Sequence, residues 1–130
     1  MTILSRLFPV FIAVGLAASP AAAYEAQNGF TVRQLDKSRF EVLPRGGLSA
    51  SDAWCAAGDF VIHGLRLARN TKIWRISEPP RPSGKSIVFS LSSDGATSNT
   101  GLASFGGGAS VSANHGDTIC DSMRMMRLDR

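Results

Sequence analysis

Apolar and polar side chains alternate through residues 30–43, and this alternation predicts a β-hairpin. Phe30 and Val32 fall on one face of the first strand, and Phe40 and Val42 fall on one face of the second. A short polar run separates the two strands and is typical of a turn. We therefore expect a hairpin with one face directed toward the core.

After Ser49 the apolar spacing changes to three and four, which predicts a helix over residues 50–64. Ser49 and Asp52, three positions later, have the pattern of a helix start. Six residues form the expected buried stripe: Trp54, Cys55, Gly58, Val61, Ile62 and Leu65. Five residues form the expected polar side: Asp52, Ala56, Asp59, His63 and Arg66.

A further strand is predicted over residues 71–77, with Trp74 and Ile76 on one face and Ile73 on the other. Apolar groups on both faces indicate a central strand. The segment 78–84 contains three prolines and cannot continue the strand, because proline has no backbone N–H to donate. We expect either a stiff connector or an exposed docking segment for an extended peptide there.

Residues 86–92 alternate clearly, which predicts a strand with Ile87, Phe89 and Leu91 directed inward. Residues 101–105 are a further candidate strand, which ends at three consecutive glycines. Residues 114–117 have the composition of a turn and helix cap. The short helix expected after them has four residues on its buried stripe: Ile119, Cys120, Met123 and Met126.

The resulting order of elements is β-β-α-β-β-β-α. Long non-helical runs between the helices favour an antiparallel sheet over a parallel one. We therefore expect an α+β fold: a small single domain with an antiparallel sheet of four to five strands and two helices on one face.

The first twenty-three residues have the three parts of a secretory signal peptide. Arg6 precedes an apolar run over residues 7–18, and small residues end the segment at Ala23. The run has twelve residues, whereas a membrane-spanning helix needs roughly 20. We expect cleavage before Tyr24, a single globular domain over residues 24–130 and no transmembrane segment after cleavage.

Cys55 and Cys120 are the two cysteines of the chain, and an even number in an exported protein favours a disulfide. A zinc site with His63 and His115 is not expected. Eight residues of helix separate Cys55 from His63 by about 12 Å, too far for two ligands of one ion. No Cys-x-x-Cys motif supports redox chemistry, so we expect neither a metal nor another cofactor.

The charge of the chain argues against a nucleic-acid partner. Without Arg6 the domain has 13 basic residues (14 less one) against 10 acidic ones, a formal charge of +3. These charges are dispersed, whereas nucleic-acid binding needs basic clusters. We expect a periplasmic or secreted protein. The sequence contains no signal that defines its oligomeric state.

These features favour a non-enzymatic accessory or binding module of the cell envelope, with an envelope protein or polymer as partner. The apolar and basic character of six residues makes them the candidate binding surface: Trp74, Pro79, Pro80, Arg81, Arg124 and Arg127. The basic segment 123–128 is a second candidate contact, for an anionic membrane.

A small periplasmic hydrolase that uses His63 or His115 is the alternative. Asp59 precedes His63 by one helical turn and could orient it as a base. Three residues near His115 have the side chains of a hydrolytic triad: Ser110, Ser112 and Asp117. The sequence contains no Gly-x-Ser-x-Gly motif, so it identifies no complete catalytic set.

Overall fold

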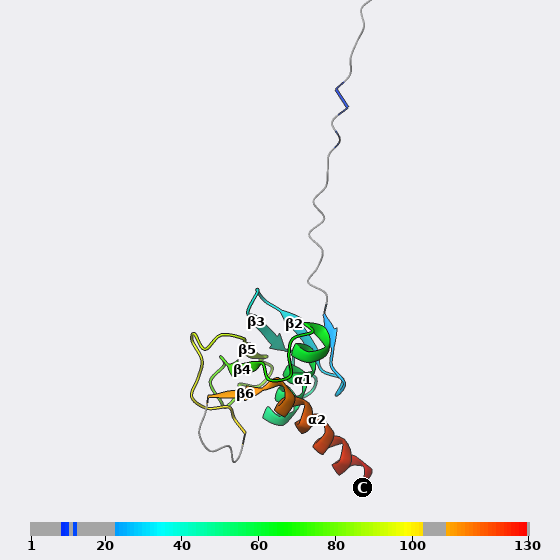
Figure 1. Cartoon of the computed structure of the whole chain (residues 1–130), viewed down its shortest axis with the longest axis vertical. Helices are drawn as coiled ribbons and strands as arrows, with labels where there is room; N and C mark the ends of the chain where they lie inside the picture. The colour runs from blue at the N-terminus through cyan, green and yellow to red at the C-terminus, as the bar shows by residue number, and fades with distance from the viewer. Residues whose placement is uncertain (1–8, 11, 13–22, 103–108, 130) are drawn as a thin grey trace, which may run out of the picture.

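The computed structural model describes residues 9–10, 12, 23–102 and 109–129 (Figure 1). Most of the expected signal peptide lies outside these residues. So do the expected strand at 101–105 from residue 103 onward and the three glycines after it. Residues 101 and 102 themselves do not form a strand.

The described chain forms one antiparallel sheet and two helices, which confirms the expected α+β class. The strands are β1 Tyr24–Glu25, β2 Thr31–Gln34, β3 Arg39–Val42, β4 Lys72–Arg75, β5 Ile87–Ser90 and β6 Ser110–Ser112. The helices are α1 Ala50–Asp59, its π-helical continuation η1 Phe60–Gly64, and α2 Ala113–Leu128. The sheet order is β1-β2-β3-β5-β4-β6, so the sheet has more strands than the four to five expected.

Strands β2 and β3 form the expected hairpin, with Val32 opposite Val42 in the antiparallel register. Val32, Phe40 and Val42 are buried, as the alternation predicted. The Asp36 carboxylate closes the turn by accepting hydrogen bonds from the backbone N–H groups of Ser38 and Arg39. These bonds stabilise the charged carboxylate, so they lower the pKa of Asp36.

Helix α1 packs on the sheet through aromatic side chains. The ring of Trp54 lies 4.7 Å from that of Phe89, and the ring of Phe60 lies 4.9 Å from that of Phe40. Ser49 caps the helix as expected, because its hydroxyl accepts a hydrogen bond from the N–H of Asp52.

The expected polar side of α1 is partly wrong. Ala56 is fully buried and Asp59 is only 4 % exposed. Helix α2 packs against α1, so a side of α1 that the periodicity assigned to solvent is covered as well. When a helix is covered on several sides, the spacing of its apolar residues no longer distinguishes the buried side from the exposed side.

Helix α2 begins earlier than expected. Residues 114–117 are its first turn and not a separate turn, because the Ser112 hydroxyl accepts the backbone N–H of His115 and caps the helix at Ala113. Met126, expected on the buried stripe, is 68 % exposed. The last turns of α2 project away from the sheet and α1, so nothing in the described chain covers them (Figure 1).

Cys55 and Cys120 form the expected disulfide, which links α1 to α2 across 65 positions of sequence. Within the part of the chain that the structure describes, no helix is both long and apolar enough to cross a bilayer.

Candidate functional site

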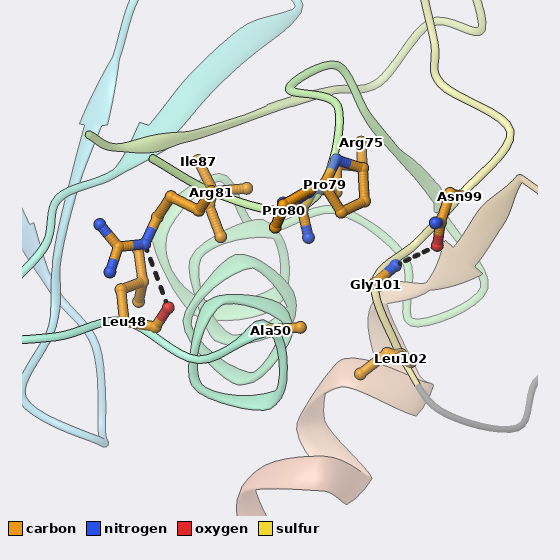
Figure 2. Close-up of a pocket in the computed structure, with 10 residues that line it drawn as sticks. All are labelled: Leu48, Ala50, Arg75, Pro79, Pro80, Arg81, Ile87, Asn99, Gly101 and Leu102. Carbon is orange, nitrogen blue, oxygen red and sulfur yellow. Dashed lines mark hydrogen bonds between the residues drawn. The ribbon is translucent and has the colours of Figure 1, made fainter. Parts of the chain in front are cut away.

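A groove of about 510 Å³ lies between the proline-rich loop and the start of α1. Figure 2 shows Pro79 and Pro80 facing Ala50 of α1, with Arg81 at one end of the groove. Asn99, Gly101 and Leu102 lie at the other end. The groove is open to solvent along the loop and has both apolar and basic walls. Its lining residues are Leu48, Ala50, Arg75, Pro79, Pro80, Arg81, Ile87, Asn99, Gly101 and Leu102.

The floor of the groove includes Arg75, a buried residue that is only 2 % exposed. Its Nε donates a hydrogen bond of 2.7 Å to the carbonyl of Ser77, and one Nη donates 3.1 Å to the carbonyl of Thr100. Burial lowers the pKa of Arg75, and the negative charge of Glu78 opposes that shift. Because guanidinium remains protonated in proteins, the groove floor is positively charged.

Arg81 provides a second guanidinium at the rim. Its Nε donates a hydrogen bond of 3.2 Å to the carbonyl of Leu48, drawn in Figure 2. Its Nη1 donates to the carbonyls of Pro82 and Lys85. These bonds fix the side chain across the loop, and Nη2 donates to none of the described residues. Arg81 therefore keeps N–H donors for a ligand.

Neither guanidinium pairs with a carboxylate of the described residues. Within the described ranges, the ion pairs of the chain involve other basic residues, and every hydrogen bond of Arg75 and Arg81 ends on a backbone carbonyl. Carbonyl groups orient a guanidinium without neutralising it. The groove therefore combines apolar contact area with two guanidinium groups that no carboxylate of the described residues contacts directly, which suits an anionic ligand.

The structure separates the six candidate surface residues into three places. Pro79, Pro80 and Arg81 lie together in the groove. Trp74 does not line it. Arg124 and Arg127 line a smaller hollow of about 60 Å³ beside the disulfide.

Arg75 is the charged groove residue that sequence reasoning missed. It shares a strand face with buried Ile73, two positions earlier, and the face opposite to Trp74 was expected to be apolar. Strand alternation thus contained the signal, although a basic residue is seldom placed in a core.

The residues of the alternative hydrolase do not assemble as a triad with Ser112. The Ser112 hydroxyl accepts a hydrogen bond from the backbone N–H of His115 in the helix cap. His63 Nε2 lies 3.8 Å from Asp59 Oδ1 on the same helix, and the His63 side chain is 54 % exposed. Asp59 was expected to be solvated, but its carboxylate accepts hydrogen bonds from Tyr24 and Gln27.

Comparison of the chain with protein-family models, with curated proteins and with solved structures found no match.

Proposed function

We propose that this protein is an exported, non-enzymatic binding domain whose groove binds an extended acidic segment of an envelope protein. The observation that carries the proposal is the pair of guanidinium groups, Arg75 and Arg81, without a carboxylate partner in the described chain and beside an apolar wall. An acidic side chain or terminal carboxylate would supply a directly bonded countercharge through charge-assisted hydrogen bonds.

The shape of the groove favours a peptide over a compact anion. Pro79, Pro80, Leu48, Ile87 and Leu102 give it an apolar lining that an inorganic anion would not use. An extended chain presents side chains alternately to two sides, so one side can carry carboxylates while the other contacts the prolines.

Two further findings are compatible with export. The cysteines form a disulfide, which is typical of proteins in oxidising compartments. No helix of the described residues is suited to span a membrane. The signal peptide and cleavage before Tyr24 remain part of the proposal.

Selection from a display library of random short peptides tests the proposal. The wild-type domain should enrich peptides that combine Asp or Glu with apolar residues. A selected peptide, labelled with a fluorophore, should then bind Arg81→Gln about tenfold more weakly in fluorescence anisotropy. A charge-assisted hydrogen bond contributes about 1.5–3 kcal/mol, and 1.4 kcal/mol corresponds to a factor of ten.

Arg127→Gln is the matched control, because it removes the same charge from the exposed end of α2 and lies outside the groove. It should bind as the wild type does. Enrichment of peptides without acidic residues, or equal affinity of Arg81→Gln and wild type, would contradict the proposal.

A further inference from the structure

The disulfide and the two helices bring three potential metal ligands together, and none of the three lines the groove. Asp59 follows Cys55 by one turn of α1, and Asp117 precedes Cys120 by nearly one turn of α2. Because the two helices run in opposite directions across the bond, these aspartates face each other. His63 lies one further turn along, in η1.

The distances between the three side chains suit ligands of one metal ion better than they suit hydrogen bonds between the side chains. One ligand atom from each of Asp59, His63 and Asp117 lies within 4.8 Å of the other two. The 3.8 Å between His63 Nε2 and Asp59 Oδ1 is too long for a hydrogen bond. Two ligands at about 2.1 Å from a tetrahedral ion are themselves about 3.4 Å apart.

Hydrogen bonds from residues outside the cluster occupy one oxygen of the Asp59 carboxylate, and its other oxygen, Oδ1, accepts none from the described residues. Tyr24 Oη and the Gln27 backbone N–H both donate to Asp59 Oδ2, at 3.1 and 2.9 Å. The Asp59 side chain is only 6 % exposed. On this largely buried side chain, Oδ1 is the carboxylate oxygen that accepts no hydrogen bond from the described residues, and it lies 3.8 Å from the imidazole Nε2 of His63. A cation held between the two atoms would complete this arrangement.

Asp117 is oriented in the same way from outside the cluster. Gln27 Nε2 donates to its Oδ1 at 3.1 Å, and Arg69 Nη1 donates to its Oδ2 at 3.2 Å. Gln27 therefore contacts both carboxylates and holds them side by side. Metal ligands in proteins are commonly fixed by such second partners, which orient the ligating atoms.

We propose that Asp59, His63 and Asp117 bind one divalent transition-metal ion, with water completing its coordination. One imidazole and two carboxylates are a donor set that zinc and similar ions accept, whereas calcium and magnesium prefer oxygen ligands alone. The half-exposed His63 side chain can turn toward the carboxylates and leaves a path to solvent. This donor set contains neither cysteine, so it is independent of the disulfide.

Calorimetric titration of the purified, tag-free oxidised protein with Zn²⁺ tests the site, and the visible absorbance of Co²⁺ reports the ligand field. Wild type should bind one equivalent of metal. His63→Ala should weaken binding about tenfold or more, since even an outer partner of a metal site contributes that much. His115→Ala removes the other histidine of the chain and should leave the affinity unchanged.

A second pair of variants guards against an effect on folding. Asp117→Asn should also weaken Zn²⁺ binding, while Asp121→Asn, on an exposed position of the same helix, should not. Zn²⁺ should raise the melting temperature of wild type and of the two control variants, His115→Ala and Asp121→Asn, because it binds the folded state. Absence of a Zn²⁺ complex in wild type, or binding by His63→Ala as tight as that of wild type, would overturn the proposal.

Discussion

Asp59 combines burial with a network of polar contacts that joins three parts of the fold. Its carboxylate accepts hydrogen bonds from Tyr24 in β1 and from Gln27 in the turn that follows, and it also lies near His63 in η1. A buried carboxylate is tolerated only when donors replace the water it has lost. At the residue scale, Asp59 therefore attaches the first strand to the helix.

The same contact predicts a pH dependence at Tyr24. Burial, followed by the charge of Asp59 and the hydrogen bond to it, raises the pKa of Tyr24 from 10.0 to about 12. The folded state therefore holds the phenolic proton more tightly than the unfolded state does. This stabilisation is complete below about pH 10 and is lost as the pH rises from about 10 to about 12.

Tyr24 is the one tyrosine of the chain, so near-ultraviolet absorbance of its phenolate measures the titration directly. The folded protein should titrate near pH 12 and the protein in concentrated urea near pH 10. Tyr24→Phe is the control and should lack this absorbance change. Identical midpoints in the folded and unfolded states would contradict the contact with Asp59.

At the scale of elements, the contact between α1 and α2 depends on two glycines. A Cβ on Gly116 would lie 2.6 Å from the carbonyl oxygen of Trp54 and 3.0 Å from the Cα of Gly58. These are backbone atoms, which cannot move without shifting a helix. The close approach explains why Gly116 lies inside a helix, where glycine is otherwise unfavourable.

Gly116→Ala should therefore destabilise the protein by about 1–3 kcal/mol, the usual effect of overpacking. The clash with backbone outweighs the gain of about 0.5–1 kcal/mol in helix propensity that alanine brings. The free energy of unfolding in urea measures the change. Gly47→Ala is the control, because nothing lies within 4 Å of its added Cβ, and it should change stability by less than about 0.5 kcal/mol.

At the scale of the whole molecule, local periodicity predicted the elements whose surroundings are simple. The hairpin residues Val32 and Phe40 lie on the apolar face of their strands, so the alternation predicted their burial, although it did not predict that Glu41 on the other face of β3 is buried too. Asp59 could not be placed, because its burial depends on hydrogen-bond partners distant in sequence. The alternation of β4 put Arg75 on the inward face with Ile73, but the carbonyl of Thr100 that accepts its hydrogen bond comes from a segment distant in sequence. Strand β1 has two residues, too few for any period.

The candidate groove was predictable only in part for the same reason. Pro79 and Arg81 were evident as a basic proline-rich loop. Asn99 and Gly101 form the far end of the groove. Tertiary folding brings their segment to the groove, and no local sequence pattern predicts that position. Arg124 and Arg127, chosen for their charge, lie at another surface.

The disulfide gives a prediction for global stability. It closes 65 positions of sequence between the first helix and the last. Reduction should lower the free energy of unfolding by about 4 kcal/mol in the loop-closure estimate, because the reduced unfolded chain gains conformational entropy. Urea unfolding of oxidised and reduced wild type measures this difference.

A double variant, Cys55→Ala with Cys120→Ala, is the control for the reductant and should unfold at the same urea concentration with and without it. Equal stabilities of oxidised and reduced wild type would contradict a structural role for the bond.

The order of strands in the sheet has a consequence for how the protein behaves at high concentration. The two edge strands are β1, with two residues, and β6, with three residues and followed at once by α2. A foreign strand that attempts to add to the sheet therefore meets only a few unpaired backbone groups. Proteins resist intermolecular β-aggregation in this way, so this domain keeps its longer, more adhesive strands in the interior of the sheet.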